Sequence, residues 1–284
     1  MNDQSTVRVF IGSGEASLIE CKTAIHSLRK HTKRELDIYV FNGTHNAVRL
    51  NDGEPFLAPM SLKIKYRNIT EFSLYRFLIP ELCEYQGKAI YIDSDTICLS
   101  DIGELFDTPM DDHDFLAKDE AYRGKKLWGL SVMLIDCQRC RFDLEKVVDE
   151  IDAGLYSMTD FSCMGPRFLA HHEYKIGRLN PTWNEFDRWD DQTRLIHYTN
   201  LDTQPWKYPN HPFGDLWFDY FNEALAAGRV TNRDIELSMI RGYVRRDLLA
   251  GNFRSQAILP NLVRQLAAPV KRVLRDVASR INLA

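Results

Sequence analysis

Two aspartates, Asp93 and Asp95, stand two residues apart directly after the apolar run of residues 89–92. In an extended chain, residues i and i+2 point to the same side, so both carboxylates can be aimed at one point. Two neighbouring anions repel, and one takes up a proton unless a cation lies between them. Oxygen ligands of this kind suit Mg²⁺ or Mn²⁺, and such an ion keeps open positions for the phosphate oxygens of a substrate. The spacing by itself also fits a solvated strand end, so the motif needs supporting context.

The elements around the two aspartates show alternating strand and helix patterns. The run of residues 89–92 is apolar at every position, which predicts a strand buried on both faces. Further strands are predicted over residues 7–11, 36–41, 115–117, 130–135 and 194–198. Helices are predicted over residues 17–31, 71–82 and 141–151. The stretch 42–59 is rich in Asn, Gly and Pro and predicts a long polar loop.

Strands that alternate with helices predict an α/β fold with a mostly parallel mixed sheet flanked by helices. In such sheets, ligands bind outside the carboxyl ends of the strands. Asp93 and Asp95 follow the carboxyl end of their strand. The sequence therefore predicts a ligand site at this edge of the sheet.

Composition narrows the class of protein. The 284 residues are 44% hydrophobic and 27% charged, which is typical of a globular chain with a sizeable core. The net charge of −4 disfavours nucleic-acid binding, because a phosphate backbone requires a basic face. No apolar run approaches the roughly 18 residues of a membrane span, and residues 1–10 lack a signal-peptide pattern. Together with six scattered cysteines, these features predict a cytoplasmic protein.

The chain becomes helical toward its end, and we expect a domain over residues 1–230 and a helical C-terminal extension over residues 231–284. Residues 258–284 have an apolar stripe at helical spacing. The opposite face carries Arg264, Lys271, Arg272, Arg275 and Arg280 against the single acid Asp276. Two interpretations stay open. The segment lies on the anionic inner face of a membrane, or it packs on the domain with its arginines in water.

Beyond the two aspartates, the sequence contains several further motifs. The segment AIYIDSDTICLSDIGELF, residues 89–106, resembles the metal-binding segment of the family 8 glycosyltransferases, the glycogenin-like and galactosyltransferase-like enzymes with the GT-A fold. An upstream helix offers Arg76 where that family has a Lys or Arg. Segments 128–136 and 179–184 are similar to two later family motifs, and His197 is followed by residues 204–207, Gln-Pro-Trp-Lys. The resemblance covers roughly residues 7–225.

The resemblance implies a retaining transfer of a sugar from a UDP-sugar donor. It implies that Asp93, Asp95 and His197 bind Mn²⁺ or Mg²⁺, and that the ion binds the diphosphate of the donor. Arg76 is expected to add positive charge at the phosphates or near the sugar.

The donor nucleotide is expected to lie along the loop after the first strand. Residues Ile11, Gly12, Ser13 and Gly14 precede a predicted helix, whose N-terminus favours anions. Ser94, between the two aspartates, is expected to contact the donor as well. The family lysine that contacts the diphosphate is replaced by Gln204, and Lys207 is the nearest cation that can substitute for it.

Two further acids are candidates for the reacting end of the site. The stretch 158–163 corresponds to a family motif for the transferred sugar, and Asp160 or Thr159 is the predicted contact there. Asp119 is a second acid that can line the pocket or remain a solvated loop charge. The resemblance does not separate a covalent from a front-face route to retention.

The acceptor is open among a glycan, a glycolipid and a protein, and a lipid-linked precursor of a surface polysaccharide fits the basic C-terminal segment. A homo-oligomer is also open. Two other functions compete with transfer. One is a phosphatase of the haloacid dehalogenase type with Asp93 as nucleophile, and the other is a binding protein of the same fold without turnover.

Overall fold

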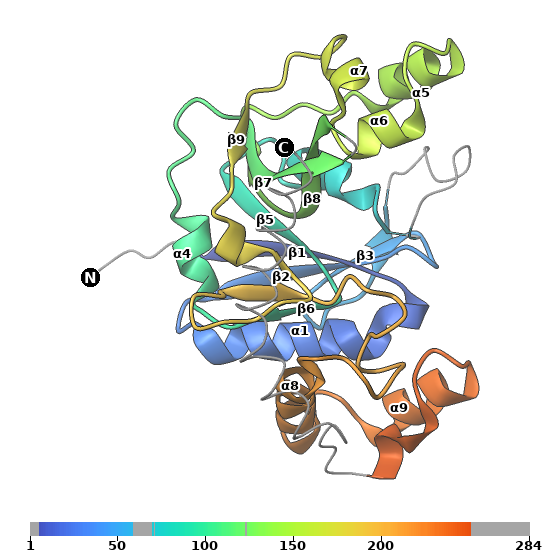
Figure 1. Ribbon diagram of the computed structural model, residues 1–284. Helices are drawn as coiled ribbons and strands as arrows, with labels where there is room; N and C mark the ends of the chain where they lie inside the picture. Colours follow the sequence, from blue (N-terminus) through green and yellow to red (C-terminus); the bar gives the residue numbers. More distant parts are fainter. Residues whose placement is uncertain (1–5, 59–69, 71, 123, 251–284) are drawn as a thin grey trace, which may run out of the picture. The chain divides into compact units, whose positions relative to one another are not determined.

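The computed structural model describes residues 6–58, 70, 72–122 and 124–250 (Figure 1). The chain divides into two compact units, Met1–Tyr198 and Thr199–Ala284. The sequence-predicted domain boundary at residues 230 and 231 falls inside the second unit. The predicted amphipathic segment 258–284 lies outside the described residues.

The first unit contains an eight-stranded sheet with the order β4-β3-β2-β1-β5-β8-β7-β9. Its strands are β1 (Val7–Ser13), β2 (Leu36–Asn42), β3 (Ala47–Leu50), β4 (Phe56–Leu57), β5 (Lys88–Asp93), β7 (Phe115–Tyr122), β8 (Lys125–Asp136) and β9 (Ile176–Arg178). The pairs β1–β2, β1–β5 and β7–β9 are parallel, and the other pairs are antiparallel. The sheet is thus mixed, and its parallel core around β1 carries the predicted ligand edge.

A second, three-stranded sheet has the order β10-β11-β6. Its strands are β10 (Glu185–Phe186), β11 (Leu195–His197) and β6 (Thr96–Cys98). β6 follows β5 after a two-residue bend, and β11 pairs with β6 in antiparallel orientation. This small sheet therefore brings a late segment of the first unit to the end of β5.

Helices cover both faces of the large sheet (Figure 1). They are η1 (Glu15–Ser17), α1 (Leu18–His31), η2 (Tyr75–Leu78), α3 (Ile79–Leu82), α4 (Ile102–Phe106), α5 (Leu144–Asp152), α6 (Met158–Ser162), α7 (Pro166–Leu169) and η3 (Pro181–Trp183). Residues of α1 and α4 join one hydrophobic core, and residues of η2, α3, α5, α6 and α7 join the other.

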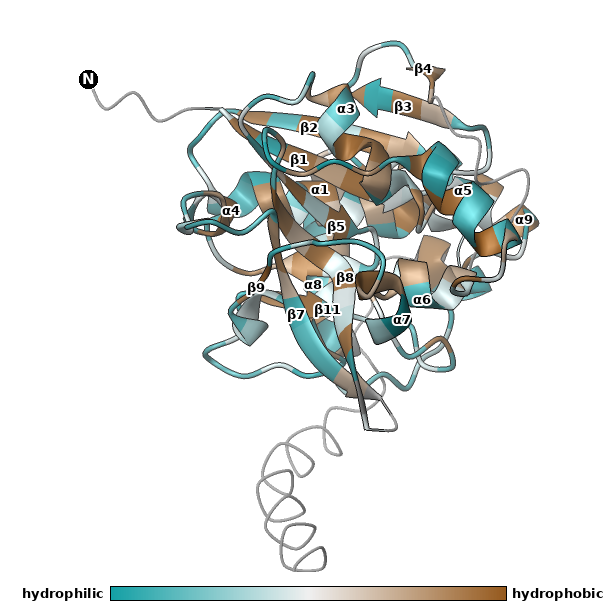
Figure 2. Cartoon of the chain, turned by 90° about the horizontal axis from the view of Figure 1, so that it is seen from above, coloured by the Kyte–Doolittle hydropathy of each residue, from teal (hydrophilic) through white to brown (hydrophobic). Residues whose placement is uncertain are grey.

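Strand β5 shows why the site edge is rigid. Ala89 and Tyr91 belong to one core, while Ile90 and Ile92 belong to the other. All four are at most 1% exposed, which confirms the predicted strand buried on both faces. Figure 2 shows the same feature as brown colouring of β1 and β5, in contrast to the largely hydrophilic α5.

Two local predictions were wrong. Residues 42–59 were expected to form a loop, yet they contain β3 and β4. The Ala47–Leu50 segment pairs with β2 and extends the sheet, because turn residues 43–46 reverse the chain into a hairpin. The helix predicted over residues 71–82 is instead the 3₁₀ helix η2 followed by α3. Pro80 lacks the N–H that would continue the hydrogen-bond ladder of η2, and it lies in the first turn of a new helix that begins at Ile79.

The second unit begins with turns over residues 199–213 and continues with helices. It contains α8 (Gly214–Ala226), α9 (Asn232–Ile240) and η4 (Arg246–Ala250). Trp217 stacks on Phe221 with ring centroids 5.1 Å apart, and Trp206 packs against Trp217 at 5.3 Å. None of the helices among the described residues has the length and hydropathy needed to cross a membrane.

Candidate metal and nucleotide site

The two motif aspartates converge at the end of β5. Asp93 is the last residue of β5, residues 94 and 95 form a bend, and β6 begins at Thr96. The Thr96 hydroxyl donates to the Asp93 carbonyl at 2.9 Å and closes this bend. The convergence therefore comes from a turn rather than from the extended i, i+2 geometry that the spacing suggested.

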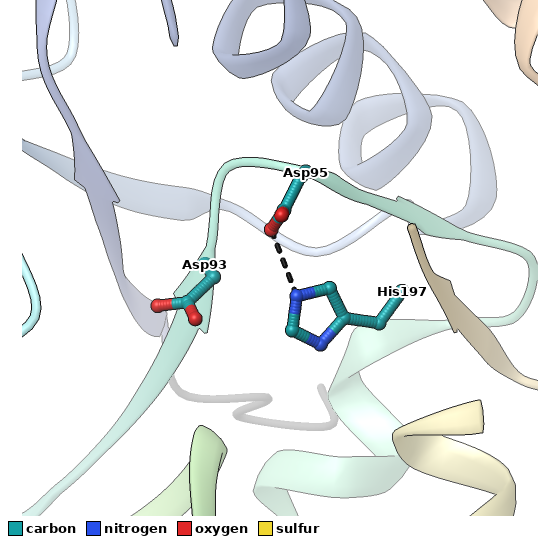
Figure 3. Close-up of side chains that lie close together, drawn as sticks. All are labelled: Asp93, Asp95 and His197. Carbon is teal, nitrogen blue, oxygen red and sulfur yellow. Dashed lines mark ion pairs between the residues drawn. The ribbon is translucent and has the colours of Figure 1, made fainter. Parts of the chain in front are cut away.

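His197 completes the cluster from a distant part of the sequence (Figure 3). It ends β11, and its register partner in the antiparallel pair with β6 is Thr96. The next backbone N–H, that of Tyr198, donates to the Asp95 carbonyl at 2.9 Å. These ladder bonds bring His197 Nε2 to 2.9 Å from Asp95 Oδ1.

One candidate ligand atom from each of Asp93, Asp95 and His197 lies within 4.8 Å of the other two. This group is the only such cluster found among the described residues. Two carboxylate oxygens and one imidazole nitrogen are a donor set that suits Mn²⁺ or Mg²⁺ and leaves coordination positions for phosphate oxygens. The three predicted metal ligands are thus brought together, and their chemistry fits the expected ion.

Asp93 is held from one side by two neighbours. The Tyr91 hydroxyl donates to Asp93 Oδ1 at 2.6 Å, and Arg76 Nη2 lies 3.4 Å from the same oxygen. The Arg76 guanidinium also stacks over the Tyr91 ring, 4.5 Å from its centroid. Asp93 Oδ2 has no hydrogen-bond partner among the described side chains and remains available to a cation.

The protonation of the cluster reflects burial and mutual attraction. Burial raises the pKa of Asp93, the Arg76 charge partly offsets this rise, and the Asp95 carboxylate adds to it. Burial on its own would lower the pKa of His197, but the Asp95 and Asp93 carboxylates raise it above its usual value. Two acids and an imidazolium in one small volume form a site that a divalent cation can enter by displacing protons.

The expected nucleotide loop lies directly beside Asp93. Gly12 is the register partner of Asp93 in the parallel β1–β5 pair, and the Ser94 N–H donates to the Gly12 carbonyl at 3.1 Å. A β-carbon at Gly12 would lie 2.2 Å from the Tyr91 hydroxyl, so a side chain has no room there. Ile11 and Ser13 are buried, and Gly14 precedes η1.

Ser94 is buried between the aspartates, and its hydroxyl has no hydrogen-bond partner among the described residues. A buried, unpartnered hydroxyl is costly unless a ligand or solvent satisfies it. This is consistent with the predicted contact of Ser94 with the donor.

The remaining predicted residues have other partners. Asp119 is exposed and pairs with Arg178 at 3.2 Å. The Asp160 carboxylate accepts from the Ser157 N–H at 2.9 Å and from the Ser157 hydroxyl at 2.6 Å, which makes it part of the capping box of α6. Their roles at the sugar stay predictions.

Gln204 and Lys207 belong to the second unit. Lys207 Nζ donates to Gln204 Oε1 at 3.0 Å, so the predicted substitute for the family lysine lies next to Gln204, and its role stays a prediction. Gln204 is 3% exposed.

Four residues around the cluster were not predicted. Asn184 accepts from His197 Nδ1 at 3.2 Å, and Lys118 and Ser131 both bond to Asn184. Glu120 has a buried carboxylate oxygen, Oε1, without a hydrogen-bond partner among the described residues. Asn184 belongs to the segment 179–184 that resembles a family motif, so the sequence pointed to it. Nothing in the sequence shows which strands would lie beside Asn184.

A comparison with protein families finds one matching family model. Residues 8–147 match the family model described as Glycosyl transferase family 8. The matched segment includes Arg76, Asp93 and Asp95 and ends before His197. The third ligand is therefore supported by the motif around His197 and by the geometry, and not by this match.

Two curated proteins are similar to the chain. Protein CDI of Arabidopsis thaliana is 28% identical over 183 residues, which are 54% of this chain and 65% of that protein. The human Glycosyltransferase 8 domain-containing protein 2 is 25% identical over 224 residues, with 57% of this chain and 63% of that protein covered. Each match spans less than two thirds of the relative's own length.

Among solved structures, the galactosyltransferase LgtC in complex with donor and acceptor sugar analogues has a TM-score of 0.56 at 14% sequence identity. The match covers 80% of this chain and 100% of that chain. At this level of identity the likeness shows the fold, which is the GT-A fold predicted from the sequence.

Proposed function

Because residues 8–147 match the family model of glycosyltransferase family 8, we propose that the protein is a metal-dependent, retaining glycosyltransferase. It moves a hexose or related sugar from a UDP-sugar to a glycan, lipid-linked or protein acceptor. The observation that carries the proposal is the convergence of Asp93, Asp95 and His197 at the carboxyl end of β5. The complex of the LgtC structure with donor and acceptor sugar analogues supports a two-substrate reaction of this type.

Asp93, Asp95 and His197 would hold the cation, and a cation bound there would neutralise the charge of the leaving diphosphate. Asp93 offers Oδ2 while Tyr91 and Arg76 fix its other oxygen. This arrangement keeps the carboxylate in one orientation before the donor arrives, so little reorganisation is needed during the reaction.

Arg76 supplies the fixed positive charge beside the cluster. It is 7% exposed, and its Nε donates to the Ser73 carbonyl at 2.7 Å, which restrains the guanidinium. We assign it to the developing negative charge of the diphosphate. The loop of residues 11–14 and Ser94 provide backbone and hydroxyl groups for the nucleotide.

The acceptor end of the proposal is less specific. Asp160 and Asp119 are the acids assigned to the sugar side, and Gln204 with Lys207 is assigned to the diphosphate. Residues 258–284 are assigned to an anionic membrane surface on its cytoplasmic side, where a lipid-linked acceptor would be presented.

The proposal is tested by thermal unfolding of the full chain with Mn²⁺ or EDTA and a panel of nucleotides and sugar nucleotides. A ligand that binds only the folded state stabilises it by about 2.7 kcal/mol at 100 times its dissociation constant. We expect UDP or one UDP-sugar to raise the unfolding midpoint only when Mn²⁺ is present. Asp95→Asn should abolish this shift.

Asp112→Asn is the matched control, because Asp112 is an exposed carboxylate paired with Lys175 at 2.7 Å. It should keep the full shift. Absence of any nucleotide effect on the wild type with Mn²⁺ would sink the donor assignment. A UDP-sugar that binds but is never turned over with any acceptor would support the binding protein without turnover.

A further inference from the structure

The imidazole of His197 is held at both ring nitrogens. Nε2 faces Asp95 Oδ1 at 2.9 Å, and Nδ1 lies 3.2 Å from Asn184 Oδ1. A neutral imidazole carries one proton, and the partner of one nitrogen decides whether the other has a free lone pair for a metal. An oxygen acceptor at Nδ1 leaves Nε2 as the ligand atom on the side of the two aspartates.

Asn184 is itself fixed in one orientation. It is fully buried, and its Nδ2 donates to the Ser131 hydroxyl at 3.0 Å. The Ser131 hydroxyl also lies 3.5 Å from Asn184 Oδ1, so it contacts both ends of the amide. Only the orientation with Oδ1 toward His197 gives the Nδ1–H of the imidazole an acceptor, because the other orientation would place the amide donor there.

The backbone of Asn184 has a separate anchor. Lys118 Nζ donates to the Asn184 carbonyl at 2.7 Å and lies 3.8 Å from the centroid of the Phe186 ring. Burial lowers the pKa of Lys118. Phe186 is in turn the register partner of His197 in the β10–β11 pair. Lys118, which belongs to β7, thus connects β7 to β10 and to the residue that precedes β10.

A distortion of the large sheet lets Ser131 and Lys118 reach the same residue. Ala117 pairs with Met133, but the next residue, Lys118, pairs with Gly129, so the β7–β8 register shifts. Residues 130–132 of β8 are the extra length at this bulge. Bulges of this kind redirect side chains beside functional sites.

We propose that Ser131, Asn184 and Lys118 are positioning residues that orient His197 so that Nε2 faces the divalent cation. This inference rests on the metal site of the proposed function and deepens it. These three residues act through His197 and touch neither the cation nor the substrate.

Binding of Mn²⁺ alone to the full chain, measured from the electron paramagnetic resonance signal of the free ion, tests the inference. Asn184→Leu keeps the approximate size but cannot accept from Nδ1, and we expect Mn²⁺ affinity about 10–100-fold weaker. Asn184→Asp restores an acceptor oxygen and should stay within a few-fold of the wild type. Ser131→Ala should fall between them.

Asn180→Leu is the matched control. Asn180 lies in the same segment and is exposed, and its side-chain oxygen accepts from the Thr182 N–H at 3.1 Å and from the Thr182 hydroxyl at 2.9 Å. It should change stability without changing Mn²⁺ affinity. Unfolding midpoints in EDTA show which variants are folded.

Wild-type affinity in a folded Asn184→Leu overturns the inference, and so does an Asn184→Asp variant as weak as the leucine variant. If Asn184→Leu does not fold, Ser131→Ala and Asn184→Asp decide by the same criterion. If the wild type binds no Mn²⁺, the metal site of the proposed function fails and the inference fails with it. If it binds and the variants do not differ, only the inference fails.

Discussion

At the residue scale, the site consists of charged and polar side chains whose burial is stabilised by their contacts with one another. His197 pairs with Asp95, while Arg76 and Tyr91 contact Asp93. Replacing any one of them leaves a buried charge or donor without its partner, which is more costly than the pair is worth. Metal binding and stability are therefore coupled in these residues.

Glu120 shows the opposite case, a half-buried acid with one buried carboxylate oxygen that lacks a partner among the described residues. Its Oε1 lies over Gly129, where a β-carbon would approach to 2.5 Å, and it has no hydrogen-bond partner among the described residues. Burial raises the pKa of Glu120, while the Lys118 and His197 charges lower it in part. The ionised form is therefore less favourable in the folded than in the unfolded chain.

A raised pKa in the folded state means that stability is fully present below the unfolded pKa and is lost as the pH rises through the folded pKa. Glu120→Gln should therefore raise the unfolding midpoint in EDTA at pH 8 and change it less near pH 4.5. Thermal unfolding across this range checks the prediction. A difference that stays constant with pH would contradict it, and Glu145→Gln on the exposed side of α5 is the control.

At the element scale, strand pairing brings the candidate metal ligands together. β5, the bend at residues 94–95 and β6 are local, whereas β11 comes from about a hundred residues later and is fixed by its antiparallel register with β6. The bulge in β7–β8 then brings polar side chains to the same place. The site is a meeting of two sheets rather than a property of one loop.

The capping box of α6 allows a test that distinguishes a helix-capping role of Asp160 from a contact with the sugar. Ser157→Ala and Asp160→Asn each remove part of the cap, and each should destabilise the protein by about 1 kcal/mol. Chemical denaturation measures this. Unchanged stability in Ser157→Ala would contradict the cap's contribution.

Turnover measured well below the unfolding midpoint then isolates the predicted sugar contact. Equal turnover in the two variants assigns Asp160 to the cap alone. A loss confined to Asp160→Asn assigns it to the sugar as well.

At the scale of the whole molecule, the cation would link segments that are distant in sequence. It would join the end of β5 to the end of β11, across the small sheet. We expect Mn²⁺ to slow amide hydrogen exchange in β6 and β11 of the wild type and to have no such effect in Asp95→Asn. Exchange followed by mass spectrometry checks this, and equal protection in the variant would contradict it.

The sequence by itself determined three things. It gave the pair of aspartates after a buried strand, the family resemblance and all three candidate ligands. These are local signals: the uninterrupted apolar run before Asp93 and the spacing of short motifs report directly on burial and residue chemistry. The β1, β2, β5 and α1 positions followed from the same periodicities.

Only the tertiary structure decided which groups support those ligands. The contacts of Asn184 with Ser131 and Lys118, and the burial of Glu120 beside Gly129, depend on strand register and a bulge. The strands β3 and β4 were missed for the same reason, since a short edge strand is stabilised by its partner rather than by its own residues. Register is set by the packing of the whole sheet, and a one-residue slip would turn each of these side chains to the other face.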